Sequence, residues 1–246
     1  MKKVSIKTII SLGLLFIGAS CTKVDNYPGP DSAFQGNISD SVTGKNLLTE
    51  SQGLNIELKQ LSWSDNPDPY YIPAKDDGSF QDTRIFSGHY SVVPTQGPFW
   101  PVDSIVTDIK GTTTHNFTVV PYLEITNFTH VQAGDSLVMT CQISAPRTDG
   151  LPQILEVWPF VNNTPFVGSG AYISQLTISD HNSPSYNLAD INSTWNSGIA
   201  TTTYQVIVHG LLNGRTYYAR VGVRVNDSYK KYNLSEVAPI VMPPEK

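Results

Sequence analysis

The chain has 246 residues, a formal net charge of −5 at pH 7 and two cysteines, Cys21 and Cys141. Its 16 Lys and Arg residues are scattered along the sequence and form no cluster. Binding to nucleic acid draws most of its free energy from counterions that clustered basic side chains release, so the composition excludes nucleic acid as an expected partner.

The first twenty residues have the layout of a secretory signal peptide. Lysines stand at positions 2, 3 and 7, an apolar run covers residues 9–17, and small residues precede Cys21. The segment GASC resembles a bacterial lipobox, in which the cysteine becomes the acylated first residue of the mature chain; the alternative is an ordinary cleaved signal that leaves a free cysteine. We therefore expect residues 1–20 to be a signal peptide and residues 21–32 to be a lipidated tether that anchors the protein to a membrane.

Acylation of Cys21 leaves Cys141 without a cysteine partner in the same chain, so no intramolecular disulfide is expected. The free energy that stabilises the fold must then come from hydrophobic cores. The residues that follow the signal are numerous enough to build two ordinary domains.

Beyond the tether, apolar residues alternate with polar ones and show no helical spacing. In the segment GLNIELKQLSW, Leu54, Ile56 and Leu58 share one face, and the phase then slips by one before Leu61 and Trp63, which indicates a bulge or a strand end. Turn signals recur along the chain in the segments TGKN, KDDGS, SGH, GDS and NGR. Short strands between regular turns, without intervening helices, predict an all-β fold of antiparallel sandwiches.

The segment LSWSDNPDPYYIPAK, residues 61–75, carries three large aromatic rings among prolines and acidic or amide side chains. Its prolines exclude a regular helix and a central strand. The rings either fold back under a loop or are offered to a ligand.

The clearest strand is YYARVGVRV near the C-terminus. Tyr217, Ala219, Val221, Val223 and Val225 point to one side, which we expect to face a core, while the residues between them point to the other side and to water. In DSLVMTCQIS, the residues Leu137, Met139, Cys141 and Ile143 form a second core-facing row, which makes Cys141 a buried thiol.

Leu211, Gly214 and Tyr217 have the spacing of a tyrosine corner, in which the phenol hydroxyl bonds to upstream backbone. With YLEITNF as an opening strand and NLSEVAPIVM as the last one, residues 122–246 resemble a fibronectin type III or related immunoglobulin-like domain.

The first half resembles the transthyretin-like, carboxypeptidase-regulatory-like sandwich. The segments FQGNISDSVTGKNLL and DDGSFQDTRIFSGHYSVVP carry its recurring glycines, its Thr-Gly turn and its Gly-x-Phe and Gly-x-Tyr endings. We assign residues 33–121 to this domain, with the segment VVPY around Pro121 as a short, stiff join.

The lipobox, the DNYPGPDSAFQGNISD start, the loop QGPFWPVDSI, the join NFTVVPYLEI and the tail YYARVGVRVNDSYKKYNLSEVAPI together resemble a family of Bacteroidetes lipoproteins known as domain of unknown function 3823. The resemblance implies a location and partners: an outer-membrane, lipid-anchored protein beside a glycan importer and its substrate-binding lipoprotein in a polysaccharide utilisation system. It supplies no catalytic or ligand residues. Lys23 and Asp25 loosely resemble a surface-export tag, which favours the cell surface.

The sequence offers little material for catalysis. Its five histidines stand singly, and there is no HExxH, GxSxG or Walker-type loop. Asp76 and Asp77 precede Gly78 in what reads as a plain hairpin turn without a metal ion. We therefore expect neither an enzyme nor a metal or other cofactor.

Candidate residues for sugar binding lie in three loops. Sugars stack their apolar C–H faces on aromatic rings and accept or donate hydrogen bonds to Asp, Asn and Gln side chains. The candidates are Trp63, Asp65, Asn66, Tyr70 and Tyr71 in the first loop, Phe99 and Trp100 in the second, and Trp195 in the polar segment INSTWNSG. In a transthyretin-like domain the first two loops would lie at one end of the sandwich.

Packing is the alternative role for these rings, because long loops need rings of their own as a core, and QGPFWP is bracketed by prolines. The sequence thus predicts a non-enzymatic outer-membrane lipoprotein that captures polysaccharide or oligosaccharide for an importer. The alternative is a structural or protein-docking accessory with no glycan affinity, whose aromatic rings would be buried at the domain junction.

Overall fold

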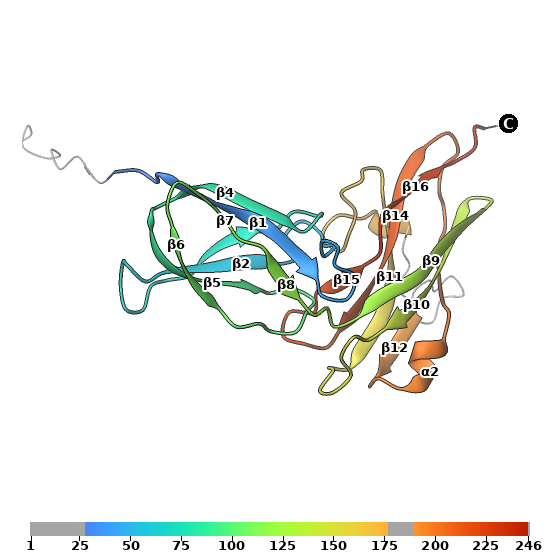
Figure 1. Cartoon of the computed structure of the whole chain (residues 1–246). Helices are drawn as coiled ribbons and strands as arrows, with labels where there is room; N and C mark the ends of the chain where they lie inside the picture. The colour runs from blue at the N-terminus through green and yellow to red at the C-terminus, as the bar shows by residue number, and fades with distance from the viewer. Residues whose placement is uncertain (1–27, 177–188, 246) are drawn as a thin grey trace, which may run out of the picture. The chain divides into compact units, whose positions relative to one another are not determined.

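The computed structural model describes residues 28–176 and 189–245. The expected signal peptide, Cys21 and the first part of the tether lie outside these residues. Residues from Asp31 onward form one compact unit that is built almost entirely of strands (Figure 1). Among the described residues, no helix combines the length and the apolar character that crossing a membrane requires.

Two sheets form the first sandwich. One has the strand order β3-β2-β5-β6, and in the other β1 lies between β4 and β7 and also pairs with β8. The strands are β1 (Ser32–Asp40), β2 (Asn55–Gln60), β3 (Tyr70–Pro73), β4 (Ser79–Ile85), β5 (Gly88–Thr95), β6 (Ile105–Ile109), β7 (Thr112–Thr114) and β8 (Phe117–Val119). Most pairs are antiparallel as expected, but β1 runs parallel to β7 and β8.

The period-two pattern positions the first core. Leu54, Ile56 and Leu58 are buried as predicted, and they face Phe34 and Phe80 within the same hydrophobic cluster. The phase slip is a strand end, because β2 stops at Gln60. The expectation that residues 61–75 hold no central strand is confirmed, since β3 is an edge strand of its sheet.

Two further sheets form the second sandwich, with the orders β13-β10-β9 and β12-β11-β14-β15; β16 also pairs with β14. The elements are β9 (Glu124–Ala133), β10 (Ser136–Ser144), β11 (Ile154–Asn162), η2 (Ser174–Leu176), β12 (Ala189–Ser193), α2 (Ser197–Thr201), β13 (Tyr204–Val208), β14 (Thr216–Val225), β15 (Tyr232–Leu234) and β16 (Ala238–Val241). The fold is all-β with two sandwiches, as the sequence predicts.

Several predicted details of the second sandwich are confirmed. The phenol oxygen of Tyr217 accepts a hydrogen bond of 3.1 Å from the Leu212 backbone N–H, which is the expected tyrosine corner. Cys141 is buried in the core with Leu137 and Met139, and burial raises the pKa of its thiol to about 12. At neutral pH this thiol is therefore protonated and unreactive.

The expectation that one face of β14 points to water is wrong. Arg220 and Gly222 are buried there, beneath a separate hydrophobic cluster that includes Phe160, Val167 and Tyr232. The pattern within β14 could not reveal this, because the covering residues belong to other segments of the chain.

Polar contacts join the two sandwiches. The Arg220 guanidinium donates to the Thr49 carbonyl oxygen at 3.0 Å, and Asn233 donates to the Pro98 carbonyl oxygen at 2.9 Å. The Glu50 carboxylate, itself buried, accepts hydrogen bonds from Ser169 and from the Gly170 backbone N–H. Burial lowers the pKa of Arg220 to about 10, an effect that the nearby Glu50 charge opposes.

Candidate functional site

Trp63 is the most exposed of the predicted ring residues. It lies in the turn that follows β2, where its backbone N–H donates to the Gln60 carbonyl oxygen at 3.0 Å, and 74% of the residue is accessible to solvent. Asp65 and Asn66, further along the same connection, are exposed as well. The turn therefore offers a ring and two polar side chains to solvent.

Tyr70 and Tyr71 are both exposed, but they point to opposite faces of β3. Tyr70 lies opposite the buried Leu58, and its hydroxyl donates to Asp82 on β4, so it ties the rims of the two sheets together. Tyr71 lies opposite Glu57 on the outer face and donates to that carboxylate at 3.0 Å. These two neighbours in sequence cannot share one binding surface.

The hydrogen bonds of the two tyrosines also fix the protonation of their phenols. The bond to Asp82 raises the pKa of Tyr70, and the bond to Glu57 raises the pKa of Tyr71, because each carboxylate favours the neutral phenol that donates to it. Both phenols are hydrogen-bond donors at neutral pH and are already engaged.

The second predicted loop is packed. Phe99 is only 4% exposed within the first core, so the prediction that its ring is free to stack on a sugar is wrong. The Trp100 ring packs edge-on against Tyr122 with centroids 5.2 Å apart, and the Arg147 guanidinium lies 4.3 Å from the Trp100 ring. Both rings therefore have the alternative role, which is packing.

Trp195 is partly buried against the second core, immediately before the helical turn α2 that Asn196 caps. The helix cap turns this polar segment back onto the sandwich, so the ring is not a free platform. Trp158 is also partly buried, and Tyr186 lies outside the described residues.

The strand register separates the two ring-bearing loops of the first sandwich. Gln60, at the end of β2 that leads to Trp63, pairs with Tyr90, whereas Asn55 at the other end pairs with Thr95, from which the chain leads to Phe99. The loops therefore lie at opposite ends of the sheet, and the expectation that they lie at one end of the sandwich is wrong.

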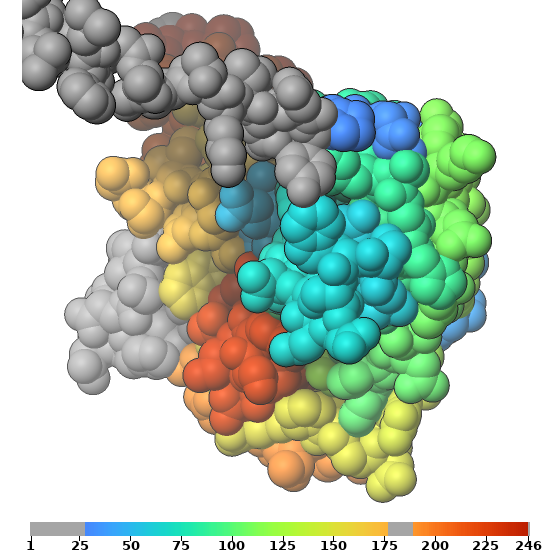
Figure 2. All heavy atoms as spheres, turned by 90° about the vertical axis from the view of Figure 1, so that its left-hand side faces the viewer, coloured from blue at the N-terminus to red at the C-terminus, as the bar shows by residue number. Residues whose placement is uncertain are grey.

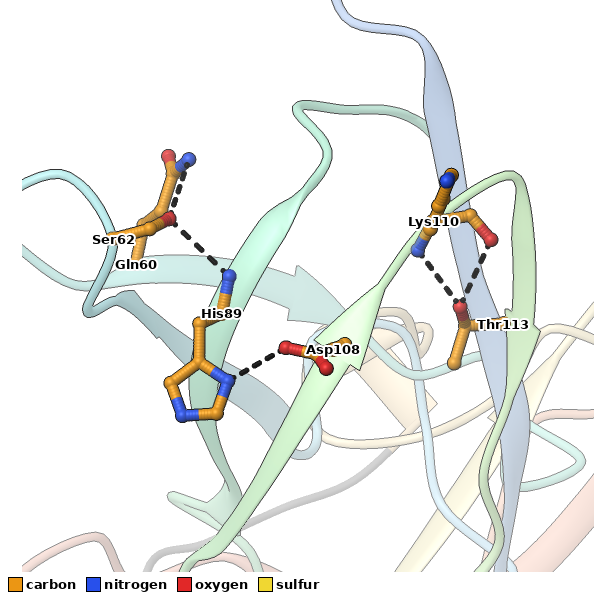
Figure 3. Close-up of polar contacts among 6 residues, drawn as sticks. All are labelled: Gln60, Ser62, His89, Asp108, Lys110 and Thr113. Carbon is orange, nitrogen blue, oxygen red and sulfur yellow. Dashed lines mark hydrogen bonds and ion pairs between the residues drawn. The ribbon is translucent and has the colours of Figure 1, made fainter.

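Polar side chains surround the Trp63 turn instead. The Ser62 hydroxyl accepts a hydrogen bond of 3.2 Å from the His89 backbone N–H, and Gln60 approaches the same hydroxyl at 3.5 Å. The His89 ring contacts the Asp108 carboxylate across the β5–β6 pair, with 2.7 Å between Nδ1 and Oδ1 (Figure 3). We call Ser62, Trp63, His89 and Asp108 the turn platform.

The turn platform lies at the surface of the first sandwich, where the residues of the β2–β3 connection, cyan in Figure 2, stand beside the green residues of β5 and β6. Sequence reasoning did not name His89 or Asp108 as candidates for sugar binding. Alternation could have found them, because Tyr90 and Ile109 are buried and their neighbours must then point outward.

Comparison with known proteins places the chain in a family. Residues 32–120 match the family described as "Protein of unknown function (DUF3823) N-terminal domain", and residues 123–239 match "Domain of unknown function (DUF3823_C)". A comparison with curated proteins gives no match.

Solved structures share the fold. A "putative carbohydrate binding protein" from Bacteroides uniformis superimposes with a TM-score of 0.73 at 19% identity, and a DUF3823 family protein from the same organism with 0.71 at 22%. A DUF3823 family protein from Parabacteroides merdae gives 0.64 at 21%. Each comparison covers 87% of this chain and 100% of the other. The chain therefore belongs to the DUF3823 family, as its motifs predict.

Proposed function

We propose that this protein is a non-enzymatic, lipid-anchored accessory that captures polysaccharide or oligosaccharide at the outer membrane, on the cell surface, for a glycan importer. The observation that carries the proposal is the turn platform, where the Trp63 ring is exposed and its neighbour Ser62 accepts a hydrogen bond from the His89 backbone N–H. The fold shared with a "putative carbohydrate binding protein" supports it.

The platform has the chemical groups that a sugar needs. The exposed indole of Trp63 offers an apolar face for the C–H groups of a pyranose ring. The exposed imidazole of His89 and the carboxylate of Asp108 offer donors and acceptors for hydroxyl groups. An open surface of this kind suits a long polysaccharide better than a small metabolite, which would need an enclosed pocket.

The contacts of the platform favour binding over hydrolysis. Although Ser62, His89 and Asp108 resemble the composition of a hydrolytic triad, the Ser62 hydroxyl meets the backbone N–H of His89 and not its imidazole. The imidazole therefore has no path by which to take the serine proton. Among the residues that the structure describes, no group of three or more His, Cys, Asp or Glu side chains is arranged to hold a metal ion.

A second candidate function is favoured by a different observation. Phe99 is buried in the first core and Trp100 packs against Tyr122 where the sandwiches join, and buried rings of this kind are what a structural or protein-docking accessory predicts. Such a protein would bind the importer or its substrate-binding lipoprotein and would have no affinity for glycan.

Affinity electrophoresis separates the two candidates. Both hydrophobic cores lie within residues 31–246, so a chain that begins at Thr22 keeps the described fold and is soluble enough for gels. We expect at least one neutral polysaccharide to retard this protein, and Trp63→Ala to weaken the retardation by about tenfold, because a lost ring stack costs roughly 1–1.5 kcal/mol.

The matched control is Phe166→Ala, which removes a ring that is 65% exposed in the second sandwich and far from the platform in sequence. This variant should migrate like the wild-type protein. Normal migration in every polysaccharide, together with co-purification of a neighbouring lipoprotein from cells, would instead establish the docking role.

A further inference from the structure

A cleft of about 590 Å³ lies between the two sandwiches and is lined by residues of both. Its first wall comes from the end of β1 and the loop that follows it, and its second wall from β9 and the β15–β16 connection. The volume falls within the range of about 300–1,000 Å³ that is usual for small-ligand sites. Leu47, Ile125 and Phe128 contribute apolar surface to it.

The charges in the cleft are mostly negative. Asp40, Asp77, Glu124 and Glu236 line it, against the single lining cation Lys45. Lys45 is exposed, with its Nζ atom 3.9 Å from Glu236 Oε1, so it offsets that carboxylate. The other three carboxylates have no cation among the residues that line the cleft.

Internal hydrogen bonds hold two of these carboxylates in place. Asp40 accepts from the Val42 backbone N–H at 2.7 Å and from the Thr43 hydroxyl at 2.8 Å. Asp77 accepts from the backbone N–H and the hydroxyl of Ser79, and these bonds hold the pKa of Asp77 below its usual value. Both groups are therefore fixed acceptors in the walls of the cleft.

Glu124 differs from them, because its Oε1 atom is buried and has no hydrogen-bond partner, although the carboxyl group as a whole meets Asp40 and Ser144. Burial raises the pKa of Glu124 to about 7, and the adjacent Asp40 carboxylate acts in the same direction. A buried acceptor without a donor is costly, so this position favours either a proton or a donor that arrives with a ligand.

We propose that the cleft is a binding site for an organic cation, namely a primary ammonium group carried on an apolar stem. The ammonium supplies three donors and a positive charge to Glu124 and Asp40, and the stem lies against Leu47 and Phe128. The same carboxylates repel an anionic ligand, which separates this site from a phosphate or uronate site. The proposal is independent of glycan capture at the turn platform.

Three probes of equal length test the charge preference: n-hexylamine, n-hexanol and n-hexanoate, titrated into the chain from Thr22 at pH 8 and followed by the amide NMR signals of residues 123–126. We expect the amine to bind about tenfold more tightly than the alcohol, because charge-assisted hydrogen bonds are stronger than neutral ones. The hexanoate should bind most weakly. Equal affinities, a preference for hexanoate, or no saturable shift with the amine would overturn the proposal.

The pH dependence gives a second criterion. Asp40 and Ser144 are the groups that meet the Glu124 carboxyl, and Asp77, Lys45 and Glu236 are the other charged residues that line the cleft. A bound ammonium requires Glu124 to be ionised. Affinity for hexylamine should therefore rise by up to about tenfold between pH 6 and pH 8, as expected for one group that titrates near 7. Glu124→Gln should abolish this rise and weaken binding at pH 8, whereas the matched change Glu245→Gln in the exposed C-terminal segment should leave both unchanged.

An acetylated, amidated lysine separates two sources of the ammonium group. Binding of this probe at least as tight as that of hexylamine identifies the side chain of a partner protein as the ligand. Weaker binding, with hexylamine retained, identifies a free amine. Both results support the ammonium site, and failure of both probes contradicts it without bearing on polysaccharide retardation by the turn platform.

Discussion

At the scale of single residues, the alternation of a strand decides which rings are available to a ligand. Tyr70 and Tyr71 carry the same kind of ring, yet one ties the two sheets and the other lies on the outer face. Trp63 is not subject to strand alternation, because it follows the end of β2 and lies in a turn. The residue composition of a loop could be read from the sequence, but the direction of each ring depended on whether a strand contained it.

The buried polar residues were beyond sequence reasoning. Arg220 stands at an alternate position in β14, where the strand pattern predicts water, and its partner Thr49 is 171 positions away. Glu50 likewise meets Ser169 and Gly170 across the junction. No local pattern encodes such contacts, because they join residues of two different sandwiches.

Tyr217→Phe tests the tyrosine corner. The change removes the phenol oxygen that accepts the Leu212 N–H bond and leaves the ring in the core, so the free energy of unfolding should fall by about 1–2 kcal/mol. Urea denaturation measures this loss. Tyr218→Phe, on the opposite face of the same strand, is the control, and an equal loss in both variants would mean that the corner bond contributes nothing specific.

At the scale of secondary-structure elements, periodicity predicted the central strands well and the irregular ones poorly. The segment NLSEVAPIVM was expected to be one strand, but the structure has β15 and β16 with a break at Ser235. The Ser235 hydroxyl accepts the Val221 backbone N–H at 3.1 Å, so a side chain replaces the backbone partner and the chain changes course there.

The formation of short elements likewise depends on tertiary contacts that the local sequence does not encode. The strand β3 formed where prolines indicated a loop, because an edge strand can leave one row of its backbone groups unpaired. The parallel pairs of β1 with β7 and β8 carry no local signal either, since their partners are about 79 residues apart. Hydrophobic alternation specifies which face is buried and not which strand lies alongside.

Gly36→Ala tests the close packing around β1. A Cβ atom at this position would lie 1.8 Å from the His115 carbonyl oxygen, which is backbone and cannot move aside without breaking the pairs of β1 with β7 and β8. We expect a loss of at least about 3 kcal/mol in the free energy of unfolding, or failure to fold.

Gly44→Ala provides the comparison. Gly44 has a φ of +69°, but a methyl group added there would have no neighbouring atom within 4 Å, so only backbone strain of about 1 kcal/mol is expected. Denaturation midpoints of the two variants measure the difference. A Gly36→Ala protein as stable as Gly44→Ala would show that β1 and the His115 segment are less closely packed than described.

At the scale of the whole molecule, the junction couples stability to pH through Glu124. The pKa of Glu124 is about 7 in the folded protein, and its ordinary value is 4.5. Between these two values the unfolded chain is ionised while the folded protein keeps its proton, so the free energy of unfolding falls as pH rises from 4.5 to 7 and this contribution is constant above 7.

Glu124→Gln should remove that contribution. Relative to the wild-type protein, the variant should gain stability as pH rises from about 4.5 to about 8, by on the order of 1 kcal/mol after allowance for solvent screening. Chemical denaturation of both proteins at matched pH values measures it. Parallel stability curves for the two proteins would show that Glu124 titrates normally and that the junction does not shift its pKa.

The proposed glycan capture rests on the exposed indole of Trp63, and tryptophan fluorescence tests it most directly. The chain has four tryptophans, and in the structure Trp100, Trp158 and Trp195 are partly buried while Trp63 is 74% exposed. Titration with the polysaccharide that retards the protein should give a saturable blue shift, and Trp63→Phe should abolish that shift while retaining most of the affinity, because a phenyl ring still stacks. An unchanged emission spectrum at saturating polysaccharide, or the same shift in Trp63→Phe, would contradict capture at the turn platform.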